Sequence, residues 1–166
     1  MISETKETAD EDIMSKSSYE DILQKLICKH FGNSNHTVKV KDVQDVVQVG
    51  NNYLNCLHRI SLEILKDNRL EEEKVLIVKV FPEGELLQQF IREEGIFETE
   101  ITVYNNILPE INKVALNVLG ISKFSANHFE TGDNNMTVLE DLRLAGYKMA
   151  DRYAGLNFYH CNQKSR

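Results

Sequence analysis

One lysine in an otherwise apolar run constrains the fold of this chain more than any other feature. Lys79 stands within "EKVLIVKVFPEG" (73–84), between the apolar segments 75–78 and 80–81. A run this rich in β-branched residues is typical of a strand that is buried on both faces. Because burial of an unpaired ammonium costs free energy, Lys79 requires either access to water or a negatively charged partner.

Length and charge narrow the classes of protein to consider. The chain has 166 residues, which fits one domain with a hydrophobic core of its own. Its formal net charge is −7 and no cluster of lysine and arginine offsets it locally, which argues against nucleic acid and anionic membranes as partners. No apolar run approaches the length of a transmembrane helix. We therefore expect a protein that binds neither nucleic acid nor membranes.

The first residues and the cysteines favour a cytoplasmic location. Residues 1–16 are acidic and polar, without the apolar segment of a signal peptide, and are predicted to be a disordered leader. Cys28, Cys56 and Cys161 are odd in number, far apart and not at the spacing of metal ligands. We expect free thiols in a reducing compartment and no metal site.

Two segments show helical periodicity. Apolar residues recur at helical spacing over 17–31, where Ser17 or Ser18 is a candidate cap. The second helical segment covers 84–108, with a predicted break near Gly95, and Ile111 extends its apolar stripe if the helix passes Pro109.

Five segments are typical of strands. Apolar and polar residues alternate over 36–49 and 54–65, the Lys79 segment follows the polar turn "KDNRLEEE", and two further strands are predicted over 119–130 and 136–141. The turn "TGDNN" between the last two favours a hairpin. Short turns join the first three strands, which predicts an antiparallel meander. The whole order predicts an α+β fold with a five-stranded antiparallel sheet and a packed helix.

The second helical segment offers Lys79 a partner. Glu100 follows Phe97 by three residues and precedes Tyr104 by four, so all three share the helix face that packs against the sheet. Taken singly, Lys79 is explained as a lysine that extends from a sheet edge to water, and Glu100 as a surface carboxylate. Taken together, they are typical of the amino-terminal lobe of a kinase, where the lysine holds the α- and β-phosphates of ATP and the glutamate positions it.

Two further segments stand where a kinase lobe contacts its nucleotide. The turn between the first two strands has only Gly50 and lacks G-x-G-x-x-G, but the main-chain N–H groups of Asn51, Asn52 and Tyr53 could approach a phosphate. A plain hairpin is the alternative for this turn. The second segment is the end of the fifth strand, where kinase-like folds bind adenine through main-chain groups; here it comprises Val138, Leu139, Glu140, Asp141 and Leu142.

Three blocks of sequence resemble the ecdysteroid kinase-like family, a divergent relative of the choline and aminoglycoside kinases. They are "LIVKVFP", "FETEITVYNNILPEI" and "VLEDLRLAGYKMADRYAGLNFYHC", in the family's order and spacing, and the resemblance covers roughly residues 20 to 161. It implies ATP-dependent phosphorylation of a hydroxyl on a small molecule, with ecdysteroids as the best-known substrates. It also implies that Lys79 contacts the ATP phosphates, that Glu100 is its ion-pair partner and that the main chain of 138–142 is the adenine hinge.

The resemblance further implies a second lobe, which supplies the catalytic aspartate and the Mg²⁺ ligands from an HGD…N loop and a D-F-x segment. The sequence reaches Arg166 before either motif. We therefore interpret it as a truncated form, with a leader at 1–16, a kinase-like amino-terminal lobe at 17–141, and the hinge and the start of a carboxy-terminal lobe at 142–166.

Two functions follow from this interpretation. In the first, the chain is the ATP-binding lobe of a small-molecule phosphotransferase, inactive alone, with no catalytic residue of its own; Mg²⁺ and a small hydroxylated, steroid-like substrate are expected only in a full-length form. In the second, it is a non-catalytic, single-lobe binding or regulatory module. Whether this chain is an enzyme is left open by the sequence.

Overall fold

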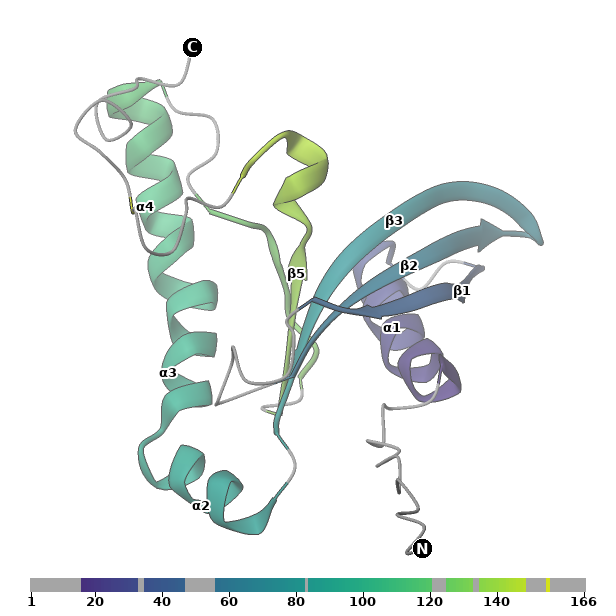
Figure 1. The fold of residues 1–166 in the computed structure, drawn as a ribbon. Helices are drawn as coiled ribbons and strands as arrows, with labels where there is room; N and C mark the ends of the chain where they lie inside the picture. Colours follow the sequence, from purple (N-terminus) through teal and green to yellow (C-terminus); the bar gives the residue numbers. More distant parts are fainter. Residues whose placement is uncertain are drawn as a thin grey trace, which may run out of the picture.

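The fold is α+β, built on one five-stranded antiparallel sheet (Figure 1). The computed structural model describes residues 16–32, 35–46, 56–82, 84–120, 125–132, 135–148 and 155. The strands are β1 (His36–Asp45), β2 (Cys56–Lys66), β3 (Arg69–Val80), β4 (His128–Phe129) and β5 (Met136–Glu140), in the spatial order β1-β2-β3-β5-β4. The predicted α+β class with a five-stranded antiparallel sheet, the meander and the last hairpin are confirmed.

The hairpin between β2 and β3 is tighter than predicted. Only Asp67 and Asn68 form its loop, with φ angles of 50° and 62°, and Lys66 pairs with Arg69 directly beyond them. Two successive residues with positive φ are the signature of the type I′ turn, whose twist matches that of paired strands. The prediction of a polar turn over "KDNRLEEE" was therefore too long, because its charged residues belong to the exposed end of β3.

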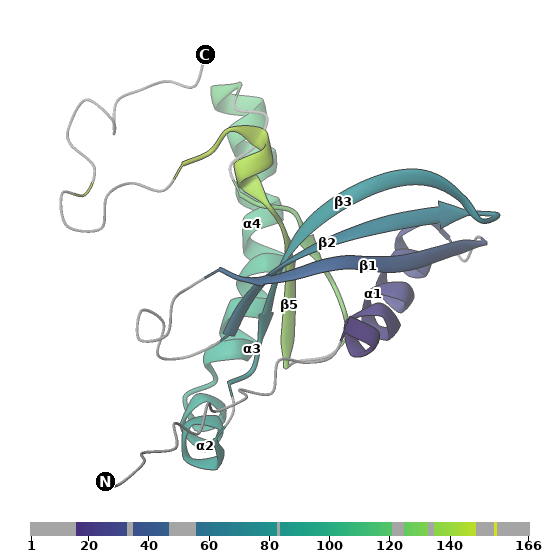
Figure 2. The same cartoon turned by 45° about the vertical axis from the view of Figure 1, so that its right-hand side comes forward.

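Helix α1 (Lys16–His30) packs on one face of the sheet and completes the main hydrophobic core. Figure 2 shows it alongside β1 to β3. Because alternate strand residues point to the same face, one face of β2 and β3 carries most of the buried apolar side chains, with His58 and Lys74 among them. The buried core comprises Tyr19, Leu23, Leu26, Ile27, Val38, Val40, Ile60, Leu62, Ile64, Leu76, Val78, Met136 and Val138. We call this the α1 face of the sheet.

Polar residues of α1 also bind the main chain of the edge strand β1. The Glu20 carboxylate accepts a hydrogen bond from the N–H of Val40 at 2.8 Å, and Gln24 Oε1 accepts one from the N–H of Val38 at 2.7 Å. These N–H groups would otherwise form an unpaired strand edge, which is a template for aggregation. Helix α1 therefore stabilises the edge as well as the core.

The other helices follow one another along the opposite side of the sheet, beside β5 (Figure 1). They are α2 (Glu85–Glu93), α3 (Ile96–Thr102) and α4 (Leu108–Val114), and two π-helical stretches, Val103–Ile107 and Ala115–Leu119, continue α3 and α4. The predicted break at Gly95 lies between α2 and α3.

The helical segment is longer than predicted, and the fourth strand is shorter. The predicted helix covered 84–108 and was extended to Ile111 only if it passed Pro109. It does pass Pro109 and ends at Leu119, followed by Gly120 with φ 67°. Proline lacks the N–H that an α-helix would donate to Asn105, and the π-helical stretch before α4 accommodates this loss. Of the predicted strand 119–130, the described part forms a strand only at His128–Phe129.

Candidate functional site

The sheet face opposite α1 carries the predicted lysine, and strand register places its neighbours in rows. One row comprises Leu57, Lys79 and Thr137, and the next comprises Arg59, Ile77 and Leu139. Thr137 is fully buried, whereas the other five side chains are only partly buried. We call this the Lys79 face.

Lys79 of β3 and Glu100 of α3 form an ion pair. Their side chains are 17% and 23% exposed, respectively, so both are partly withdrawn from water and from screening by salt. The ammonium of Lys79 also lies 5.6 Å from the centre of the buried Phe97 ring, one helical turn before Glu100, at a distance that permits a cation–π interaction. The structure thus brings together the two residues that helix periodicity placed on facing elements.

Aromatic packing holds α3 in position for this pair. The Phe97 ring lies 4.8 Å from the Phe81 ring at the end of β3, and the guanidinium of Arg92 in α2 lies 4.7 Å above Phe81. Gly95 turns the chain between α2 and α3 with φ 59°, a left-handed conformation that costs a residue with a Cβ more than it costs glycine. The location of Glu100 therefore depends on contacts that begin at the end of β3.

A second ion pair crosses the same face. Arg59 Nε of β2 donates to Asp141 Oδ2 at 2.7 Å, and the Asp141 side chain is 6% exposed. Its other oxygen accepts from the N–H of Arg143 at 3.1 Å and so caps the short 3₁₀ helix Leu142–Ala145. This pair was not predicted from the sequence. The sequence did contain one signal for it: Arg59 is a charged residue on the same face of its alternating strand as Leu57 and Ser61.

The predicted adenine hinge, 138–142, begins inside the sheet. Val138 and Leu139 pair with β3 on one side and with β4 on the other. The N–H of Glu140 donates to the carbonyl of Asn127 at 3.0 Å, and the carbonyl of Asp141 accepts from Leu144 N at 3.2 Å. The chain leaves the sheet after Glu140, so only the later part of the predicted hinge lies beyond the paired strand.

The remaining predictions concern residues outside the Lys79 face. The turn Gly50, Asn51, Asn52 and Tyr53 lies outside the described residues, as does Cys161. Cys28 is a free thiol, as predicted. Within the described ranges, no group of three His, Cys, Asp or Glu side chains could hold a metal ion. In the same part of the chain, no helix is long and apolar enough to cross a membrane.

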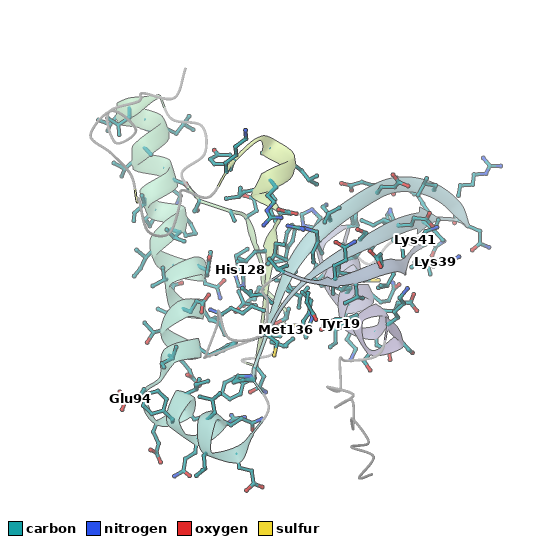
Figure 3. The ribbon with its side chains drawn as sticks, viewed as in Figure 1. Tyr19, Lys39, Lys41, Glu94, His128 and Met136 are labelled. Atoms are coloured by element: carbon teal, nitrogen blue, oxygen red, sulfur yellow. The ribbon has the colours of Figure 1, made fainter. Side chains whose placement is uncertain are left out.

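A cavity of about 480 Å³ lies between β4 and the long helix formed by α3, α4 and their π-helical stretches, and Lys79 is not among its lining residues. It is lined by His30, Tyr104, Asn105, Leu108, Pro109, Asn112, Ser125, Ala126, Asn127, His128 and Phe129. His128 Nδ1 lies 2.8 Å from Asn105 Oδ1, and burial lowers the pKa of His128 below its ordinary value, although Glu130 and Glu100 oppose this shift. Figure 3 shows His128 between the sheet and the long helix. In this cavity the polar groups of His128 and Asn105 bind each other, so we do not place the phosphate site here.

The Lys79 face has the chemistry of an anion site. It offers one ammonium held by a carboxylate from a facing helix, on a sheet surface that is only partly covered. Such an ammonium can bind a phosphate oxygen while the carboxylate fixes its position. The Arg59 guanidinium lies in the adjacent row.

Comparison with known proteins supports one family. The model of the ecdysteroid kinase-like family matches residues 49–164, which is 116 of the 166 residues and includes both ion pairs of the Lys79 face. No curated protein and no solved structure gave a match. On the family match, the chain belongs to the ecdysteroid kinase-like family, a kinase-like family of phosphotransferases.

Proposed function

We propose that this chain binds ATP on the Lys79 face, as the amino-terminal lobe of a kinase-like small-molecule phosphotransferase. The observation that carries the proposal is the ion pair between Lys79 on a central strand and Glu100 on the facing helix. Both residues lie within the segment that matches the family. The acceptor in this proposal is a hydroxyl on a small molecule of the ecdysteroid kind.

In this proposal the ammonium of Lys79 binds the α- and β-phosphates, and Glu100 keeps it in place. The pair is suited to this role because neither charge is fully exposed: each would be costly alone, and together they hold a defined geometry. The turn at residues 50–53 would cover the phosphates through main-chain N–H groups.

The adenine would meet the main chain where β5 ends. Because Val138 and Leu139 are paired on both sides, and Glu140 pairs with Leu76 and donates to Asn127, we assign this contact to Asp141 and Leu142. Phosphate transfer itself needs a catalytic aspartate and Mg²⁺ ligands, which the family supplies from a second lobe. For residues 1–166 the proposed activity is therefore nucleotide binding.

Thermal unfolding with increasing Mg-ATP tests the proposal. A ligand that binds only the folded state stabilises it by mass action, by about 2.7 kcal/mol at one hundred times its dissociation constant. We expect Mg-ATP to raise the melting temperature of the wild-type chain and to have no effect on Lys79→Ala.

The matched control is Lys74→Ala, on the same strand but the opposite face. Lys74 is also partly exposed, at 22%, and it also pairs with a glutamate, Glu72, at 3.2 Å. Its ammonium lies 5.6 Å from a phenylalanine ring, the same distance as for Lys79. Lys74→Ala should retain the ATP-dependent rise. Equal loss in both variants, or no rise in the wild-type chain, would contradict the proposal.

A further inference from the structure

Arg59 lies on the Lys79 face, one row nearer to the end of β5. Register pairs Lys79 with Leu57 and Ile77 with Arg59, so the two cations stand on adjacent strands two residues apart in register. Two residues along a strand span about 7 Å. The direction from Lys79 to Arg59 is also the direction in which β5 runs toward Asp141.

The Arg59 side chain crosses the sheet face. Its partner, Asp141, follows β5, and β3 lies between β2 and β5. Two strand spacings amount to about 9–10 Å, so the arginine must extend over Ile77 and β3 to donate to Asp141. Its guanidinium therefore lies above the sheet near the end of β5, and its side chain remains 20% exposed.

Asp141 holds this guanidinium in one place. Each carboxylate oxygen has a hydrogen-bond donor, Arg59 Nε on one and the N–H of Arg143 on the other, and the carboxylate is almost fully buried. A fixed guanidinium is a flat, delocalised cation that is more weakly hydrated than an ammonium and stacks on aromatic rings. A lysine at the same position would supply the charge without the flat surface.

We propose that Arg59 is a base-binding residue, whose guanidinium stacks on the purine ring of the nucleotide. This proposal rests on the proposed function, because it takes the phosphates to be at Lys79. A nucleotide extended from Lys79 toward the end of β5 passes through the row of Arg59, Ile77 and Leu139. In that row, Ile77 and Leu139 supply partly buried apolar contacts for the ring, and Arg59 supplies the cation. Asp141 is the positioning residue, since it acts through Arg59.

Calorimetric titration with two ligands separates the base from the phosphates. The ligands are Mg-ATP and Mg-tripolyphosphate, which has the phosphates but no nucleoside. The variant is Arg59→Lys, which retains a positive charge beside Asp141 and removes the planar group. Loss of stacking on one base corresponds to about a tenfold weaker affinity. We expect this loss for ATP and no change for tripolyphosphate.

Asp141→Asn supplies a second variant, because it retains Arg59 but removes the charge that orients it. It should weaken ATP binding and leave tripolyphosphate binding unchanged. The melting temperature of each variant without ligand shows whether it is folded, and a variant that fails to fold is replaced by the other.

Four results would overturn the proposal. Unchanged ATP affinity in Arg59→Lys would remove the base contact. Equal weakening of both ligands would show that Arg59 acts only through charge or folding. Equal affinity of the wild-type chain for Mg-ATP and Mg-tripolyphosphate would show that the base contributes nothing to binding. In that case, binding of both ligands that is lost in Lys79→Ala would still support the proposed function. If neither ligand binds the wild-type chain, both proposals fail.

Discussion

The two faces of the sheet are built from the same strands and have different properties. On the α1 face, Ile60, Val78 and Val138 are 0% exposed. Directly beside them in sequence, Arg59 and Lys79 point to the other face and remain partly exposed, each in an ion pair with a distant element. One face is closed by the apolar side of an amphipathic helix, and the other is held together by charges across a partly open surface.

The difference between the faces shows where the chain gains stability and where it can bind. A fully covered apolar face contributes hydrophobic stabilisation in proportion to the area removed from water. A partly covered face with fixed charges contributes less to folding but can exchange water for a ligand. Figure 3 shows Tyr19 of α1 against the sheet, on the closed face.

The largest expected effect comes from truncation on the α1 face. Ile60→Ala should lower the free energy of unfolding by roughly 2–5 kcal/mol, because it removes a fully buried side chain and leaves a cavity. Ile77→Ala, on the facing strand but on the partly open face, should cost less than about 2 kcal/mol. Urea unfolding measures both values. Equal costs would contradict the distinction between the faces.

The next effect concerns the ion pair of the Lys79 face. Glu100→Gln should cost roughly 1–3 kcal/mol, because the partly buried ammonium of Lys79 loses its counter-charge. Adding Lys79→Met should recover part of this cost, since no unpaired charge then remains. A double-mutant cycle by urea unfolding gives the coupling. Strictly additive costs would show that the two residues do not interact in solution.

A smaller effect is expected at the turn that positions α3. Gly95→Ala should cost about 1 kcal/mol, because alanine must adopt the left-handed conformation at φ 59°. A Cβ atom there would meet nothing within 4 Å, so the cost comes from the backbone alone. Thermal unfolding of the variant measures it. An increase in stability would mean that the turn adopts another conformation in solution.

The smallest effect at neutral pH is expected for Tyr19 in the α1 core. Burial raises the pKa of Tyr19 to about 12, and its hydroxyl has no hydrogen-bond partner among the described residues. At pH 7, Tyr19→Phe should therefore change the free energy of unfolding by less than about 1 kcal/mol.

The pH dependence of Tyr19→Phe sharpens this test. The unfolded chain loses the phenol proton near pH 10, whereas the folded chain retains it to about pH 12. The contribution of Tyr19 is thus fully present below pH 10 and is lost as pH rises toward 12. Melting temperatures from pH 8 to 11 should fall more steeply for the wild-type chain than for Tyr19→Phe. Parallel curves would show that the phenol is not buried.

The spacing of apolar residues in the sequence predicted which side chains of a strand or helix share one face. Alternation in β2 separated Ile60 from Arg59, and helical spacing placed Glu100 on the face that meets Lys79. The Arg59–Asp141 pair could not be predicted in this way. It depends on β5 pairing with β3, which brings Asp141 within reach of Arg59 on β2. A strand order of this kind is set by tertiary packing.

The long helix shows another limit of sequence patterns. Proline usually marks a helix boundary, so the prediction covered 84–108 and left open whether the helix passes Pro109. The structure continues it through a π-helical stretch to Leu119, and Gly120 provides a C-terminal signal that the prediction did not use. The exposed apolar residues of this last part, such as Val118 at 73%, gave no core-facing pattern to reveal it.

The central claim is that nucleotide binds on the Lys79 face. The most direct measurement is a titration of the ¹⁵N-labelled chain with Mg-ATP, following main-chain amide signals by NMR. We predict that the largest changes occur at Leu57, Lys79 and the segment from Leu139 to Arg143, with smaller changes at Leu23 and Ile27 on α1. Changes centred on α1, changes centred on the cavity beside His128, or no changes at saturating Mg-ATP would contradict the claim.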